Sequence, residues 1–248
     1  MATKDHQSEP IESASETLQR IFDGHGSVLG SQMADESSRY DVLKKTDFPK
    51  PQRTRRIAVA NQKGGVGKTT STVNTAAALA NKGAQVLVID MDPQGNASTA
   101  LGVSHASGEP SVYDVIEGRS DLGDVITVCP DFPTLDVVPA SIDLSGAELE
   151  VADLPNRNTL LKEALDLYLR QSDKHYDYVF IDCPPSLGLL VINAMCAVTE
   201  MLIPIQAEYY ALEGLGQLIN TIGLVQEHFN PVLLVSTCSS RCSIAERY

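Results

Sequence analysis

A glycine-rich segment, NQKGGVGKTTST at residues 61–72, constrains the fold of this chain more than any other feature. It follows a short apolar run, RIAVAN, and opens an Ala-rich stretch that ends near Gly83. A strand, a glycine turn and a helix in this order are the context of a phosphate-binding loop. The usual pattern G-x-x-x-x-G-K-[ST] is not fully met, because Gln62 stands where the first glycine is expected and Lys63 follows it.

Short apolar runs alternate with helical stretches along the rest of the chain. The runs AQVLVID, LDVVPA, YDYVFID, EMLIPIQ and PVLLVST are rich in β-branched residues, and helices are expected over about 144–170, 187–198 and 209–229. Runs that are apolar throughout indicate strands buried on both faces. The sequence therefore predicts an α/β fold of the P-loop NTPase type, with a mostly parallel central sheet and helices on both faces.

Composition divides the chain into three segments. Residues 1–52 are rich in Ser, Glu, Asp and Gln, which predicts a flexible, largely disordered arm. Residues 53–237 carry the apolar runs and form the P-loop domain. Residues 238–248, CSSRCSIAERY, resemble neither a strand nor a helix. One codon spelling of this tail, shifted by one base, encodes a strand-like sequence, so we expect a frameshift that leaves the domain incomplete at its C-terminal part.

The charge balance and hydropathy exclude several classes of protein. The net charge of −13 means that any DNA contact would need a local basic patch, such as Arg53, Arg55 and Arg56 beside the first strand. No apolar run reaches membrane-spanning length, and the first residues lack a signal-peptide core. We therefore expect a cytoplasmic protein.

The cysteines do not indicate a disulfide or metal framework. There are five, an odd number, and no C-x-x-C pair occurs. The first three, Cys129, Cys183 and Cys196, are expected to be small buried apolar residues. The histidines show no ligand spacing, so no transition metal is assigned.

The glycine loop supplies a set of candidate nucleotide-binding residues. Its glycines let the backbone turn N–H groups inward, and the helix that follows adds its positive dipole end. Lys68 is expected to reach the β- and γ-phosphates, Thr69 to ligate Mg²⁺ through its hydroxyl, and Thr70 to contact the α-phosphate side. The expected nucleotide-binding residues are Lys63, Gly64, Gly65, Val66, Gly67, Lys68, Thr69 and Thr70.

Three carboxylates follow apolar runs and are candidates for the Mg²⁺ site and the hydrolytic step. Asp182 ends YDYVFID, and Asp90 ends VLVID with Asp92 two residues further on. A phosphate-binding loop needs such an acid on a neighbouring strand. On an extended segment Asp90 and Asp92 would point the same way. We expect Thr69, Asp90 and Asp182 to form the metal site, and Asp92 to position the attacking water.

Four motifs in order carry a family resemblance: KGGVGKTT, VLVIDMDPQGNASTALG, VFIDCPPSLG and IPIQAEYYALEGL. Over about residues 54–237 the chain resembles the ParA family of chromosome and plasmid partition ATPases. That family belongs to the deviant Walker A group, which is similar to MinD and the nitrogenase iron protein. The strings DPQGN and AEYYALEGL favour the chromosomal ParA/Soj branch. The resemblance implies a Mg²⁺-dependent ATPase with ATP and Mg²⁺ as cofactors.

The resemblance also implies roles for individual residues. Lys63 matches the extra lysine that reaches across a nucleotide-sandwich dimer to the phosphates of the other subunit. Lys68 matches the usual Walker lysine, Asp92 the residue required for hydrolysis and Asp182 the Walker B acid, so Lys63, Lys68 and Asp92 are the catalytic candidates. ATP would drive homodimerisation, and the dimer would bind DNA without sequence preference unless the altered C-terminus impairs it. A ParB-type partner would stimulate hydrolysis on the nucleoid.

Three alternatives remain open at this point. A MinD-like membrane-associated positioning ATPase would carry a C-terminal amphipathic helix, which this sequence does not show. An iron–sulfur carrier would need cysteines that bridge a cluster between subunits. A signalling or capsule-type regulator would use the same ATPase with a different cargo.

Overall fold

The computed structural model of the chain describes residues 35, 37–39, 42, 46, 48–206 and 211–240. The chain divides after Phe48, and the unit that starts at Pro49 contains every described strand. Most of the arm expected over residues 1–52, and residues 241–248 of the expected tail, lie outside the described residues.

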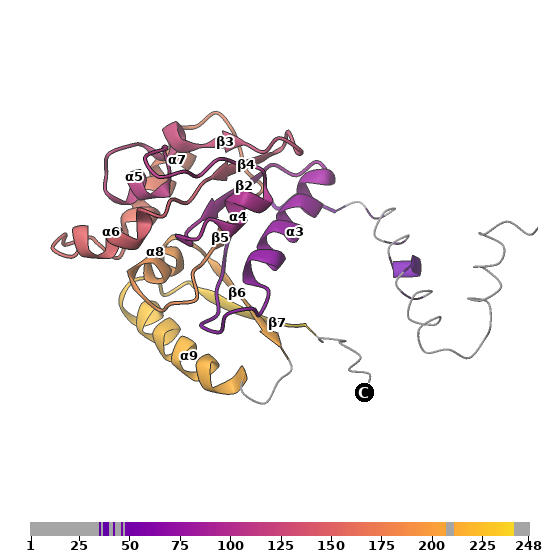
Figure 1. Cartoon of the computed structure of the whole chain (residues 1–248). Coiled ribbons are helices and arrows are strands. Elements are labelled where there is room, and N and C mark those ends of the chain that lie inside the picture. The colour runs from indigo at the N-terminus through magenta and orange to yellow at the C-terminus, as the bar shows by residue number, and fades with distance from the viewer. Residues whose placement is uncertain are drawn as a thin grey trace, which may run out of the picture. The chain divides into compact units, whose positions relative to one another are not determined.

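The described strands form one seven-stranded sheet in the order β3-β4-β2-β5-β1-β6-β7 (Figure 1). Every pair is parallel except β3 with β4. This confirms the predicted mostly parallel sheet. The strands are β1 Arg55–Val59, β2 Val86–Asp90, β3 Thr127–Val128, β4 Leu135–Val138, β5 Tyr178–Asp182, β6 Glu200–Gln206 and β7 Leu234–Ser240.

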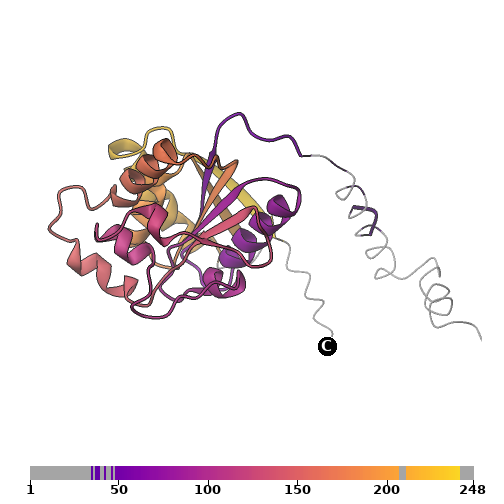
Figure 2. The same cartoon turned by 90° about the horizontal axis from the view of Figure 1, so that it is seen from above.

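Helices cover both faces of the sheet, as predicted (Figure 1, Figure 2). One face packs on α3 and the segment around α4, because Ala76 and Ala80 of α3 share a core cluster with Val59 and Val88 of the strands. The other face packs on the remaining helices in a second cluster. The helices are α3 Lys68–Asn81, α4 Asn96–Ala100, α5 Val112–Ile116, α6 Leu144–Glu150, α7 Leu160–Gln171, α8 Leu189–Ala197, α9 Ala211–His228 and the 3₁₀ helix η1 Leu122–Val125.

The sheet register brings the predicted site residues to one edge. Val59 at the end of β1 pairs with Asp182 of β5, and Asp90 of β2 pairs with the same Asp182. The strands β2, β5 and β1 are neighbours and parallel, so their carboxyl ends lie together. Ligands of open α/β sheets bind at this edge, which is where the glycine loop also begins.

Two expected boundaries differ from the structure. The helix expected over 144–170 is two helices, α6 and α7, separated by turns. Pro155 disfavours helix at the residue before it, and Asn156 and Asn158 favour turns. Strand β7 continues to Ser240, three residues past the expected boundary at 237, because its backbone stays paired with β6 as far as Gln206.

Candidate functional site

The glycine loop is shaped for an anion. Gly65 and Gly67 have φ angles of 74° and 88°, in the left-handed region that favours glycine. Gly67 is the N-cap of α3, so the unpaired N–H groups of the first helical turn face the loop. Within the loop Val66 is buried, and Gly64 is exposed. Thr70, on the first turn of α3, is exposed as well.

Asn61 anchors the start of the loop to the sheet. Its Nδ2 donates to the carbonyl of Pro204 in β6 (2.8 Å), and its Oδ1 accepts from the N–H of Lys63 (3.0 Å). The side chain is buried, so these bonds form in a protected environment. The loop is thereby tied to the neighbouring strand, which limits its movement.

Lys68 lies under the loop as a largely buried cation. Its residue is 8% exposed, and its Nζ donates to the carbonyl of Lys63 (3.4 Å). Burial lowers the pKa of Lys68, while the nearby Asp182 and Asp92 raise it. A desolvated ammonium beside a glycine loop gains free energy when an anion binds to it. The position of Lys68 therefore fits the predicted phosphate contact.

Asp182 lies beside the first turn of α3. Its Oδ2 accepts a hydrogen bond from the Thr69 hydroxyl (2.7 Å), and the Thr72 hydroxyl lies 3.0 Å from its Oδ1. Burial raises the pKa of Asp182 to about 7, with a further rise from Asp90 and a lowering from the two threonine hydroxyls. The structure thus brings Thr69 and Asp182 together as predicted.

Sequence reasoning missed Thr72. Its hydroxyl also lies 3.0 Å from the carbonyl of Lys68, and its residue is fully buried. Residues three and four positions apart share one face of a helix, so the spacing of Lys68, Thr69 and Thr72 is a signal that could have indicated it. Thr72 holds the second oxygen of Asp182 and so helps to orient that carboxylate.

Asp90 and Asp92 have different surroundings. Asp90 is fully buried, and its oxygens accept from Asp92 N–H (3.1 Å), Ser98 N–H (2.8 Å) and Ser98 Oγ (2.7 Å). Asp92 does not lie on an extended segment, because Gly95 N–H donates to its carbonyl (2.9 Å) and closes a turn. Its Oδ1 accepts from Gln94 N–H (3.0 Å). The loop therefore holds the two carboxylates in different ways.

The residues present fit a Mg²⁺–nucleotide complex. Over the part of the chain that the structure describes, no three His, Cys, Asp or Glu side chains form a metal-binding group. Mg²⁺ beside a nucleotide does not need one, because phosphates and water supply most of its ligands. One hydroxyl and one carboxylate, Thr69 and Asp182, suffice on the protein side. The cysteines Cys129, Cys183 and Cys196 are buried and free, as predicted.

A cavity of about 320 Å³ lies elsewhere, between α5, η1 and α7. Its lining contains Asp121 and Asp124 but no lysine, arginine or histidine. A phosphate group would meet like charge there and no cation. The glycine loop is therefore the better candidate for binding a nucleotide.

Residues 54–235 match a family model described as an AAA domain. The sporulation initiation inhibitor protein Soj of Bacillus subtilis is 51% identical over 179 residues, which are 72% of this chain and 69% of that protein. The chromosome partitioning protein ParA of Caulobacter vibrioides is 47% identical over 177 residues. That match covers 71% of this chain and 65% of the Caulobacter protein, just under two thirds of its length.

A solved structure is also similar. It is a crystal structure from Mycobacterium smegmatis, described as cobyrinic acid a,c-diamide synthase with bound ADP and magnesium. It has a TM-score of 0.69 and 39% identity, and the match covers 75% of this chain and 74% of that one. Fold, loop and relatives agree: this chain belongs to the ParA/Soj family of chromosome partitioning P-loop ATPases.

Proposed function

We propose that this chain is a Mg²⁺-dependent ATPase that segregates DNA. One observation carries the proposal above the others: Lys68 is buried beneath a glycine loop and beside the Thr69–Asp182 pair. Burying the Lys68 ammonium costs free energy unless an anion pairs with it, which favours a bound phosphate at the loop. The neighbouring Thr69–Asp182 pair favours a cation bound together with that phosphate. The partitioning relatives support DNA as the cargo.

The residues divide the ATPase chemistry among them. The N–H groups of the loop and of the first turn of α3 bind the phosphates, and Lys68 neutralises charge on the β- and γ-phosphates. Thr69 and Asp182 would hold Mg²⁺, which supplies further neutralisation of the phosphate charge when bound. Asp92 orients the attacking water. Phosphoryl transfer needs mainly such positioning and electrostatic stabilisation, so this set is sufficient in kind.

Lys63 acts across a dimer in this proposal. It stands on the rim of the loop, where its backbone N–H is held by Asn61. A lysine at the rim is a poor ligand for its own phosphates but can neutralise charge on those of a facing subunit. ATP binding would then favour the homodimer, which binds DNA without sequence preference. A ParB-type protein stimulates hydrolysis and releases the dimer, at a cytoplasmic, nucleoid-associated location.

The test compares wild-type protein with Lys63→Ala. ATP hydrolysis is measured alone, with DNA, and with DNA plus a ParB-type protein, and dimerisation is followed by size-exclusion chromatography with a slowly hydrolysed ATP analogue. We expect Lys63→Ala to bind ATP but to lose ATP-dependent dimerisation and stimulation. Lys82→Ala, at the far end of α3, is the matched control and is expected to behave as wild type.

Two results would contradict the proposal at different levels. Normal dimerisation and stimulation of Lys63→Ala would refute the role across the dimer. Absence of ATP hydrolysis by the wild-type protein under every condition would refute the ATPase itself. Replacing DNA with lipid vesicles tests the membrane-positioning alternative, because vesicle-dependent sedimentation with ATP would favour it.

A further inference from the structure

We propose that Asp90 is a positioning residue that holds the turn carrying Asp92, and that it is not a ligand of Mg²⁺. This inference rests on the proposed ATPase function, because it concerns the residue that orients the attacking water. It replaces the role that the sequence pattern suggested for Asp90 with one based on the contacts of its carboxylate.

Over the described residues, the hydrogen bonds of the Asp90 carboxylate come from the turn that follows it and from Ser98 of α4. The donors are the N–H of Asp92, the N–H of Ser98 and the Ser98 hydroxyl, at 3.1, 2.8 and 2.7 Å. A carboxylate offers about four acceptor sites, so three donors occupy most of them. A metal ion that needed more than the one remaining acceptor site of Asp90 would displace donors that are themselves buried, and each unsatisfied donor costs about 1–3 kcal/mol.

Ser98 extends this anchor to the next strand of the sheet. Its side chain is fully buried, and its Oγ accepts a hydrogen bond from the N–H of Ala140 (3.1 Å), just beyond β4. The Ser98 hydroxyl therefore donates to Asp90 and accepts from Ala140 at once. The turn is fixed between the end of β2 and the segment after β4.

The outer side of the turn is closed by a strap, defined here as residues 104–110. His105 of the strap lies against Gly95, where a β-carbon would come within 2.4 Å of its Nδ1. The His105 Nε2 lies 2.8 Å from the hydroxyl of Thr99 in α4. The strap thus limits outward movement of the same turn.

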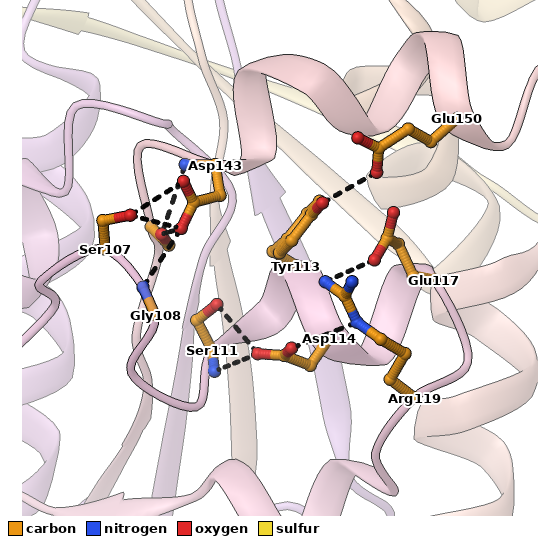
Figure 3. Close-up of polar contacts among 10 residues, drawn as sticks. Ser107, Gly108, Ser111, Tyr113, Asp114, Glu117, Arg119, Asp143 and Glu150 are labelled. Atoms are coloured by element: carbon orange, nitrogen blue, oxygen red, sulfur yellow. Dashed lines mark hydrogen bonds and ion pairs between the residues drawn. The ribbon is translucent and has the colours of Figure 1, made fainter.

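Asp143 holds the strap in place, as Figure 3 shows. It accepts hydrogen bonds from the Ser107 hydroxyl (3.0 Å to each oxygen) and from the N–H of Gly108 (3.2 Å). The hydrogen bond from the Ser141 hydroxyl, followed by those from Ser107 and Gly108, lowers the pKa of Asp143. Asp90 therefore holds the turn on its buried side, and the strap holds it on its outer side.

Such fixation matters for hydrolysis. A displacement of about 1 Å in a group that orients a reactant can cost about 100-fold in rate. Because Asp90 binds the N–H of Asp92 directly, losing one acceptor oxygen of Asp90 should move Asp92. Nucleotide and Mg²⁺ binding use other residues and should remain.

The test uses Asp90→Asn and Ser98→Ala, with the exposed turn residue Asp131→Asn as the matched control. We expect both variants to lower kcat, by tenfold or more for Asp90→Asn and less for Ser98→Ala. The Kd of an ATP analogue and the Mg²⁺ concentration for half-maximal activity should stay within twofold of wild type. In nucleotide-free protein, the amide hydrogens of Asp92 and Ser98 should exchange at least tenfold faster in Asp90→Asn.

The opposite pattern would overturn the proposal. A raised Mg²⁺ requirement of Asp90→Asn that excess Mg²⁺ corrects, with a normal Ser98→Ala, would make Asp90 a metal ligand. Unchanged amide exchange in Asp90→Asn would show that it does not anchor the turn. If wild-type protein fails to hydrolyse ATP, the proposed function fails, while the exchange comparison still decides the anchoring.

Discussion

Replacing Gly95 with alanine tests how tightly the turn that carries Asp92 is held. Gly95 has a φ angle of 63°, in the left-handed region, and is the N-cap of α4. An added β-carbon would lie 2.4, 2.6 and 3.0 Å from three atoms of the His105 ring. Both the backbone and the packing therefore disfavour alanine at this position.

The expected cost has two parts. A left-handed conformation costs an alanine about 1–2 kcal/mol. The ring of His105 must also move, which breaks its hydrogen bond with Thr99, a net loss of about 0.5–1 kcal/mol. Together these costs should lower the free energy of unfolding of Gly95→Ala by about 1.5–3 kcal/mol.

Urea denaturation of Gly95→Ala, His105→Ala and the double variant separates the two parts. With His105 removed, only the backbone cost of Gly95→Ala should remain, which leaves a coupling energy of about 0.5–1 kcal/mol between the two sites. Gly118→Ala is the matched control. Its φ angle is 71° and an added β-carbon would meet nothing within 4 Å, so it should show the backbone cost alone.

Two results would refute this reasoning. A Gly95→Ala cost no larger than that of Gly118→Ala would mean that the His105 ring does not press on the turn. Additive costs in the double variant would mean the same. The ATPase rate of Gly95→Ala gives a second readout, because displacing the turn should lower kcat with little change in the KM for ATP.

Three further predictions concern other parts of the molecule. Lys68→Met should abolish ATP binding in a calorimetric titration without lowering the free energy of unfolding, because it removes a buried ammonium but keeps the apolar stem. Asn230→Ala should lower the free energy of unfolding by about 2 kcal/mol in urea, because Asn230 Nδ2 donates to the carbonyls of Met195 in the last turn of α8 and of Val198 just after it. Glu200→Gln tests a pH dependence. The hydrogen bonds and charge of Arg55 lower the pKa of Glu200 in the folded protein. The ion pair therefore stabilises the fold above the unfolded-state pKa and is lost as pH falls through the lower folded-state pKa. The difference between wild type and Glu200→Gln, about 0.5–1 kcal/mol at pH 7, should disappear in urea titrations once the pH falls below the folded-state pKa of Glu200.

Much of the architecture could be predicted because its signals are local. Apolar runs, their alternation with helices and the glycine loop are short-range patterns, and the structure confirms a mostly parallel sheet covered on both faces. The break between α6 and α7 also has a local signal, because Pro155 and the asparagines after it interrupt the apolar spacing, and the single helix expected over 144–170 did not take that signal into account. Backbone pairing with β6, which decides where β7 ends, is a long-range property.

The candidate site shows the same division. Lys68 and Thr69 could be identified from the loop alone, and Asp182 from its place after an apolar run. Thr72 had only its helical spacing from Lys68 and Thr69 as a signal, and Ser98 had none, because their roles depend on carboxylates that lie 110 and 8 residues away along the chain. The use of the Asp90 carboxylate likewise depends on the turn that folds back onto it.

The amino-acid sequence by itself determined the glycine turn of the loop, the helix that starts at Lys68 and the order of the longer strands and helices, since these follow from local backbone preferences, whereas the short elements α4, α5, η1 and β3 were not predicted. Only the tertiary structure decided which carboxylate faces which partner. The parallel register sets Asp90 beside Asp182, and yet the first binds its own turn and the second binds Thr69. Hydrogen-bond partners of buried carboxylates are chosen by packing across the sheet, which no local pattern encodes.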